Sequence, residues 1–346
     1  RSVIDARYPE YKTAIRVFSS GTDIGLARIH ARMAQRDCTV PRETQSRLLF
    51  VVATQTGGTP QTNLDLMGAL ADGFDSWLMR CDSRHMILMR REGDNFKEVA
   101  RHELQERLDP IRHISSEYDG VIAEWLRRFD FELVHIRHLG WHSLNLPRIA
   151  KAQGCTVVFS FHDFYALCPS IKLMRADGTF YGGDLALLNG TAMPELWPAD
   201  SMPKLDAEWI RYWRTRFVEA LTPCDAFVTT SDSARTTILT HLPGIEPDRF
   251  HVIPHGRNFQ QLAILRQRPR HGDPLRILVP GNISMAKGLG IIRALLDRDS
   301  AGLLEFHILG NIDPTQGISH PRLIQHGAYK RDEFAQRVKA LSVHLG

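Results

Sequence analysis

The chain has 346 residues, about twice the length of a typical domain, which favours two domains. Hydrophobic residues make up 43% of the sequence and charged residues 24%, values that are ordinary for a globular protein and exclude disorder over most of the chain. The net charge of +4 suits an anionic ligand or a membrane surface, and it does not require a nucleic acid as partner.

The beginning of the chain carries no clear strand. Residues 1–45 mix charged and apolar residues, and residues 22–35 have helical spacing, so we predict an N-terminal helical extension. The chain begins without Met and stops directly after a helix-like segment. We therefore expect it to be part of a longer protein.

Residues 47–53 form a short, continuous apolar run, which predicts a buried strand of a parallel sheet. The segment TQTGGTPQT interrupts this run, and helical periodicity follows over residues 63–74. Further strands are predicted at residues 76–82, 85–92, 132–139, 155–163, 225–231 and 250–256. Strands that alternate with helices predict βαβ units and a doubly wound sheet. The charged stretch around Glu98 and Glu106 is interpreted as a solvated helix.

Residues 266–274 are charged and rich in Pro and Gly, so they are predicted to be a linker. They separate a first domain, residues 46–265, from a second, residues 275–346. The second domain again alternates strands and helices, and we expect it to end before its sheet is complete. The predicted fold class is therefore α/β, with two doubly wound parallel-sheet domains.

Gly57 and Gly58 lie where the first strand turns into the first helix. Glycine lets the backbone approach an anion, and a helix N-terminus carries a partial positive charge. The pattern is neither G-x-G-x-x-G nor a Walker motif, so an ordinary tight turn is the alternative interpretation.

Two further strands end in polar residues. The segment HIRHLGWH contains His135, Arg137, His138 and His142 at the carboxyl end of a strand, where open α/β sheets bind ligands. No carboxylate or Cys joins these histidines at ligand spacing, so a metal site is not favoured. Packing or surface histidines are the alternative to a binding role for this segment.

The next strand runs directly into His162 and Asp163. His162 lies at the same carboxyl edge and could donate a hydrogen bond to an anionic or hydroxyl-rich ligand. Asp163 could instead order the loop that follows it. Position alone leaves a functional and a packing role for His162 equally open.

The second domain repeats this arrangement in VPGNISMAKG, which contains Gly281, Asn282 and Lys287. A lysine near a helix start suits a phosphate group, although a solvated surface lysine is the alternative. Asp297 and Asp299 form a D-x-D pair, a pattern that can bind a divalent metal beside a nucleotide diphosphate. We discount it because it ends a helix, away from any strand tip.

Together these features resemble the retaining glycosyltransferase family 4, of GT-B fold, in the superfamily of glycogen synthases and mannosyltransferases. The resemblance covers roughly residues 47–346. The segments that carry it are FSFHD, VTTSDSARTTIL, GIEPDRFHVIPHG and the G-x-x-x-x-x-K-G pattern at residues 281–288. No single segment decides it; their order along the chain does.

The resemblance implies two Rossmann-like domains facing a cleft, with the donor held mainly by the C-terminal domain and the acceptor by the N-terminal one. His162 matches the family's catalytic strand-end histidine, near the transferring sugar. Gly57, Gly58, Gly281 and Lys287 match its donor phosphate site, in which Asn282 stands where the family has Arg. Arg137, His138 and Asp163 are assigned to the acceptor or the sugar. The family's pair of donor-site glutamates would lie beyond residue 346.

The implied reaction moves a sugar from a nucleotide-diphosphate sugar to a hydroxyl of a glycan, glycolipid or protein-linked glycan. It would retain the anomeric configuration and need neither a metal nor a cofactor. Polysaccharide biosynthesis in the cytoplasm, with peripheral contact to the membrane, fits this activity. The five scattered cysteines, without a C-x-x-C pair, agree with a reducing compartment, and no apolar run reaches the ~18 residues of a spanning helix.

Two other classes of protein share parts of this pattern. A dehydrogenase requires G-x-G-x-x-G after the first strand, and TQTGGTPQT does not have that glycine spacing. A non-catalytic protein that binds a nucleotide sugar or a glycan remains an alternative, because Asn282 removes one expected cation.

Overall fold

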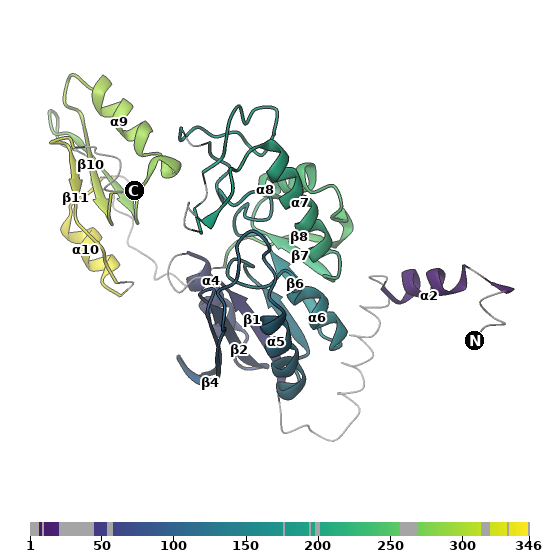
Figure 1. Cartoon of the computed structure of the whole chain (residues 1–346). Coiled ribbons are helices and arrows are strands. Elements are labelled where there is room, and N and C mark those ends of the chain that lie inside the picture. Colours follow the sequence, from purple (N-terminus) through teal and green to yellow (C-terminus); the bar gives the residue numbers. More distant parts are fainter. Residues whose placement is uncertain are drawn as a thin grey trace. The chain divides into compact units, whose positions relative to one another are not determined.

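The computed structural model describes residues 7–8, 10–20, 45–53, 58–175, 177–193, 195–197, 201–256, 269–312, 319–330 and 332–344 (Figure 1). The chain divides into two compact units, Arg1–Arg257 and Asn258–Gly346, and each is described by itself. No helix among the described residues is long and apolar enough to span a membrane.

Unit 1 is built on one eight-stranded sheet in the order β4-β3-β2-β1-β5-β6-β7-β8. The strands are β1 (Ser46–Val52), β2 (Phe74–Cys81), β3 (His85–Glu92), β4 (Asn95–Glu103), β5 (Leu133–Ile136), β6 (Thr156–Ser160), β7 (Ala226–Thr229) and β8 (Phe250–Val252). Six neighbouring strands of this sheet run parallel, namely β2, β1, β5, β6, β7 and β8. After β1 the chain adds β2, β3 and β4 on one side of this strand. It then returns to add β5 on the other side of β1, so the strand order reverses between β1 and β5.

Helices cover both faces of this sheet. One face is covered by α4 (Gly58–Ala69), whose Met67 packs on Phe50 and Val52 of the central strand. On the other face Trp125, Trp213 and Phe217 enter the largest hydrophobic cluster. The helices that carry or adjoin that cluster are α5 (Ser116–Phe129), α6 (Leu146–Ala152), α7 (Ala207–Leu221) and α8 (Asp232–His241). The sheet is thus the middle layer of three, as predicted for a doubly wound domain (Figure 1).

Local signals explain where these helices begin and end. The Ser115 side chain accepts a hydrogen bond from the Tyr118 N–H at the start of α5, and Asp130 ends the helix in the left-handed conformation. Acidic residues lie in its first turn and basic residues in its last, which complements the helix dipole. Helix α2 (Tyr11–Ser20) lies in the predicted N-terminal extension, whereas the stretch 22–35 lies outside the described residues.

The stretch around Glu98 is a strand and not the helix that its charge suggested. Strands β2, β3 and β4 form an antiparallel meander, joined by short loops in which Ser83 and Gly93 have positive φ. Loops this short can join antiparallel strands only. Because β4 is an edge strand, its charged side chains face solvent with a period that differs from that of a helix.

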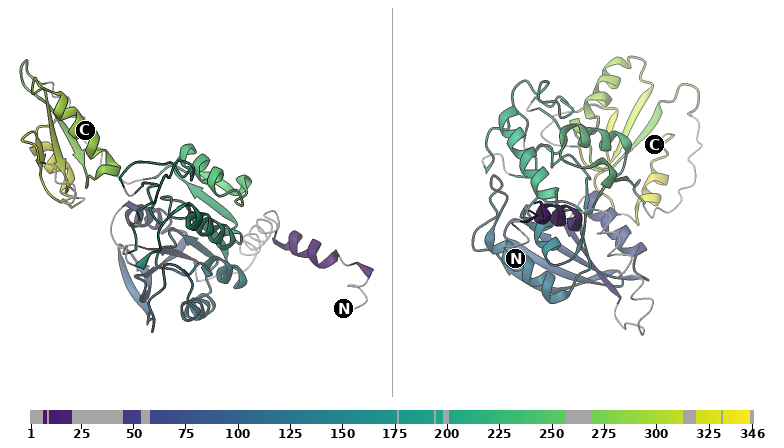
Figure 2. Two further views of the ribbon diagram at one scale, coloured as in Figure 1. Left: turned by 45° about the horizontal axis from the view of Figure 1, so that its top comes forward. Right: turned by 90° about the vertical axis from the view of Figure 1, so that its right-hand side faces the viewer.

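Unit 2 contains a parallel sheet in the order β11-β10-β9. Its elements are β9 (Leu275–Pro280), η3 (Met285–Lys287), α9 (Leu289–Arg298), β10 (Leu304–Leu309), β11 (Leu323–Gln325) and α10 (Phe334–Ala340). Helix α9 packs on one face of the sheet through Ile292 and Leu296, and α10 packs on the other through Val338 (Figures 1 and 2). Both units therefore have the Rossmann-like α/β architecture that the sequence predicted. The predicted linker 266–274 stays a prediction, since residues 257–268 lie outside the described residues.

Candidate functional site

The strand order reverses between β1 and β5, and open α/β sheets bind ligands at the carboxyl ends of the strands beside such a reversal. Gly57 lies outside the described residues, and Gly58 is the first residue of α4. No acidic residue occupies the first turn of this helix. Thr62 of α4 contacts Arg137, which follows β5, with 3.4 Å between the hydroxyl oxygen and Nη2. The first turns of α4 and the residue after β5 therefore belong to one edge of the sheet.

Arg137 is a buried cation at this edge, with 5% of its surface exposed. Its Nη1 lies 3.5 Å from the Ser160 hydroxyl, and its Nε has no hydrogen-bond partner within the described part of the chain. Burial lowers the pKa of Arg137 to about 10, so the guanidinium stays charged at neutral pH. The site thus contains a fixed positive charge.

His162 follows the end of β6 and is half-buried. Neither ring nitrogen has a hydrogen-bond partner among the described residues, and the ring stacks on His255 with 5.6 Å between centroids and 5° between planes. Burial, with a smaller effect of the Arg137 charge, lowers the pKa of His162 to about 2. The imidazole is therefore neutral and can offer one donor and one acceptor to a ligand.

His138 and Asp163 bond to each other. The backbone N–H of Gly140 donates to Nδ1 of His138 (2.8 Å), so Nε2 carries the proton and donates to Asp163 Oδ2 (3.1 Å). The other carboxylate oxygen accepts the Tyr165 N–H at 2.9 Å, which orders the loop after β6. Burial opposes ionisation of Asp163, but the electrostatic interaction with His138, together with these hydrogen bonds, outweighs it and lowers the pKa of its carboxyl.

Gly140 has no room for a side chain. A Cβ there would lie 2.1 Å from the Leu196 side chain and 2.9 Å from the His138 ring. The glycine is therefore needed for the turn that fixes the tautomer of His138.

His142 has the packing role that the sequence left open. It is fully buried; its Nε2 donates to the Val52 carbonyl (2.9 Å), and its Nδ1 accepts from the Tyr118 hydroxyl (2.7 Å). Burial lowers its pKa to about 4. This neutral histidine ties α5 to the last residue of β1 and so supports the edge on which the site lies.

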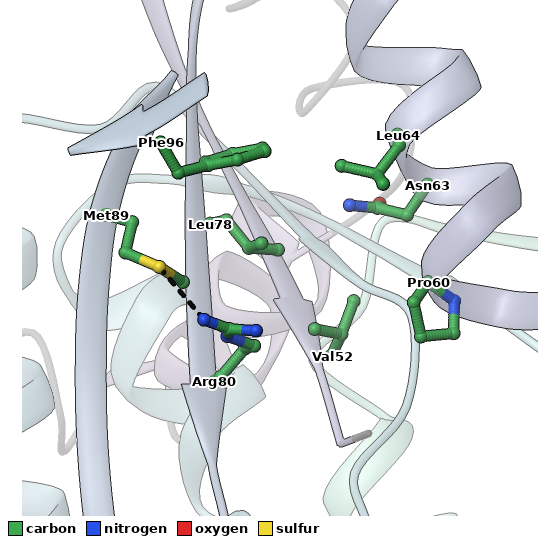
Figure 3. A pocket seen from close by; sticks show the side chains of 8 residues that line it. All are labelled: Val52, Pro60, Asn63, Leu64, Leu78, Arg80, Met89 and Phe96. Atoms are coloured by element: carbon green, nitrogen blue, oxygen red, sulfur yellow. Dashed lines mark hydrogen bonds between the residues drawn. The ribbon is translucent and has the colours of Figure 1, made fainter. Parts of the chain in front are cut away.

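A pocket that the sequence did not predict lies between α4 and the strands β1 to β4 (Figure 3). It has a volume of about 150 Å³ and is lined by Val52, Pro60, Asn63, Leu64, Leu78, Arg80, Met89 and Phe96. Arg80 donates to the Met89 sulfur at 3.2 Å, and the buried oxygen Oδ1 of Asn63 has no partner among the described residues. The pocket is mainly apolar. Its residues come from β1, α4 and the meander, whose third strand the sequence periodicity did not reveal.

In unit 2 the predicted phosphate loop joins β9 to α9. Gly281 has a φ of 89°, and Asn282 Oδ1 accepts the backbone N–H of Asn311 at 2.9 Å. Lys287 is exposed in the short 3₁₀ turn before α9 and forms no ion pair with a described residue. Its ammonium is thus available to an anion, although α9 itself starts two residues later.

Asp299 of the D-x-D pair has a structural role, whereas Asp297 is exposed and lies 3.9 Å from Nε of Arg293. Asp299 accepts the backbone N–H groups of Leu303 and Leu304 and pairs with Arg322. Over the residues that the structure describes, no three His, Cys, Asp or Glu side chains form a metal-binding cluster.

Comparisons with known proteins bear on the N-terminal unit above all. The model of the family Glycosyltransferase Family 4 matches residues 57–261, which is more than half of the chain. A search of curated proteins finds no match.

Several solved structures resemble the chain at a distance. The catalytic domain of starch synthase IV from Arabidopsis thaliana, bound to ADP and acarbose, has 11% identity, a TM-score of 0.45 and coverage of 87% of this chain and 77% of its own. A putative UDP-N-acetylglucosamine 2-epimerase from Listeria monocytogenes has 12% identity and a TM-score of 0.42, with coverage of 84% of this chain and 71% of its own. HepE of Anabaena in complex with UDP has 11% identity and a TM-score of 0.42, with coverage of 83% of this chain and 70% of its own.

Proposed function

Because the chain belongs to glycosyltransferase family 4 and has the GT-B fold, we propose that it transfers a sugar from a nucleotide-diphosphate sugar to a hydroxyl of an acceptor. The observation that supports this within the molecule is the carboxyl edge of the unit 1 sheet. There a neutral His162 has two ring nitrogens without partners among the described residues, close to the charge of Arg137. Such a pair suits a ligand with both hydroxyl groups and negative charge.

The roles follow from the chemistry of each group. A departing nucleoside diphosphate develops negative charge, which cations and N–H donors stabilise. We assign Gly57 and Gly58 of unit 1, with Gly281, Asn282 and Lys287 of unit 2, to the donor phosphates. His162 would donate a hydrogen bond to the transferring sugar or its leaving oxygen.

Arg137, His138 and Asp163 are assigned to the acceptor or the sugar. Since His138 and Asp163 already bond to each other, they act mainly by shaping the loop that carries His162. We further propose retention of configuration, independence of metal, and a glycan, glycolipid or protein-linked glycan as acceptor. A role in polysaccharide biosynthesis in the cytoplasm, in peripheral contact with the membrane, belongs to the same proposal.

The second candidate is a protein that binds a nucleotide sugar without transferring it. One observation favours it: Asn282 stands at the position of a cation, and its side-chain oxygen is already bonded to Asn311. Less positive charge at the diphosphate would leave the leaving group poorly stabilised.

One experiment separates the two candidates. The full chain is incubated with a panel of nucleotide sugars that includes ADP- and UDP-sugars, and the released nucleoside diphosphate is measured with and without mixed acceptors. A transferase consumes one donor, and consumption increases with the correct acceptor. Binding in calorimetry without release identifies the non-catalytic protein, and the absence of both binding and release contradicts both candidates.

A further inference from the structure

Arg137 is a buried charge without a counter-charge among the described residues. Among the residues that the structure describes, no carboxylate pairs with its guanidinium, and desolvation alone lowers its pKa. Burying a charge is costly unless a partner of opposite sign compensates it. The described side chains do not supply this partner, so we expect a ligand of negative charge to supply it.

The neighbouring hydroxyls do not satisfy this guanidinium. Thr62 donates its own proton to the Thr59 carbonyl (3.0 Å), and the Ser160 oxygen lies 2.7 Å from Nε2 of the half-buried His135. Their oxygens accept from Arg137 only at 3.4 and 3.5 Å. Of the five N–H donors of the guanidinium, the Nε–H has no described partner, and each Nη group has a second hydrogen.

The beginning of α4 adds to the positive potential. Thr62 brings the guanidinium to the opening turns of this twelve-residue helix, whose first turn contains no acidic residue. The unpaired N–H groups of a helix N-terminus attract anions. A neutral sugar would leave both this potential and the guanidinium without compensation, whereas an oxyanion compensates both.

We propose that Arg137, with Thr62, Ser160 and the start of α4, forms an oxyanion site that binds a phosphate group of a substrate. The inference rests on the proposed function and makes it more specific. The phosphate would belong either to the donor diphosphate or to a phosphorylated acceptor. A guanidinium suits this ligand because two of its N–H groups can bind two oxygens of one phosphate.

The test measures binding of inorganic phosphate to the full chain by calorimetry. Arg137→Met is expected to weaken phosphate binding by about tenfold or more, the contribution of a charge-assisted hydrogen bond. Arg235→Met is the matched control, because it removes a half-buried arginine of α8 that donates to the Pro247 carbonyl at 3.5 Å and has no part in the proposed site. Equal phosphate affinity in the wild type and Arg137→Met, or no binding by the wild type, overturns the proposal.

A second variant guards against misfolding. Met fits an apolar environment, so the melting temperature of Arg137→Met is expected to stay or rise. If that variant does not fold, Arg137→Lys keeps the charge but loses the planar fork, and it should bind phosphate more weakly than the wild type. Wild-type affinity in Arg137→Lys then counts against the proposal.

Competition identifies the source of the phosphate. If inorganic phosphate competes with the nucleoside diphosphate of the preferred donor, the site holds the donor; if both bind together, it holds the acceptor. Either result supports an oxyanion site. This measurement needs no turnover, so failure of the proposed transferase activity and failure of the oxyanion site are recognised separately.

Discussion

Nε2 of His138 donates to Oδ2 of Asp163 across 3.1 Å, although the two residues are 25 positions apart in sequence. The bond joins the residues just after β5 to the residues just after β6. Asp163 also holds the Tyr165 N–H, so one carboxylate orders both loops at the ligand edge of the sheet. His162 lies directly before this carboxylate, and its position therefore depends on the bond.

We expect His138 and Asp163 to be energetically coupled. In a double-mutant cycle with His138→Ala and Asp163→Ala, the coupling in the free energy of unfolding should be about 0.5–3 kcal/mol. Urea unfolding of the two single variants and the double variant gives this value. A cycle of His138→Ala with Asp232→Ala, on the exposed start of α8, is the control and should be additive. Additivity in the first cycle as well would show that the bond does not stabilise the edge.

Lys287→Ala is expected to weaken binding of the correct nucleoside diphosphate by about ten- to a hundredfold, because one charge-assisted contact is lost. Lys287 is exposed and forms no ion pair with a described residue, so its removal should not affect folding. Calorimetry on the full chain measures the affinity. Lys339→Ala, which removes an exposed lysine of α10, is the control. Unchanged affinity in Lys287→Ala would remove this residue from the donor site.

Transfer is expected to proceed without a divalent metal. Asp299 of the D-x-D pair that could have bound one accepts two backbone N–H groups after α9 and pairs with Arg322. Initial rates are compared in untreated enzyme, in excess EDTA, and after Mg²⁺ or Mn²⁺ is added back. Activity that disappears in EDTA and returns with the metal would contradict the expectation.

Stability should decrease as the pH falls below about 6.5, the pKa of histidine in an unfolded chain. Burial lowers the pKa of His142 to about 4. Between pH ~6.5 and about 4 the histidine is therefore protonated in the unfolded state and neutral in the folded state. Its contribution is present above pH ~6.5 and is lost on acidification, by about 2 kcal/mol between about pH 7.5 and pH 5. His142→Gln should lose this part of the pH dependence in urea unfolding, whereas exposed His271→Gln should keep it. Identical pH profiles in both variants would argue against a neutral buried His142.

The sequence predicted the parallel part of each sheet because apolar runs bounded by glycine and helical periodicity mark βαβ units. It predicted β2 and β3, at residues 76–82 and 85–92, but not β4, the third strand of the meander. The charged residues of β4 face solvent on an edge strand, and a stretch of high charge was interpreted as a solvated helix. The pocket beside α4 was not predicted for the same reason, since Phe96 of β4 lines it.

The candidate site was predicted in its position but not in its contacts. Strand ends identify Arg137 and His162, because the carboxyl edge of an open sheet follows from topology. The sequence could not show that His142 is committed to Val52 and Tyr118, since that depends on how α5 packs. Nor could it show that Arg137 lacks a carboxylate partner among the described residues, which only tertiary contacts reveal.

The most direct test of the site measures turnover and melting temperature on the same His162→Ala protein. Removing the ring breaks no hydrogen bond to a described residue, so the melting temperature should change little. Turnover of the preferred nucleotide sugar should fall by about 10²–10³-fold, the effect of losing one transition-state donor. His142→Ala, which loses two buried hydrogen bonds, is the control for a packing histidine and should melt at a clearly lower temperature. A lower melting temperature with nearly intact turnover in His162→Ala would contradict the account and make His162 a packing residue.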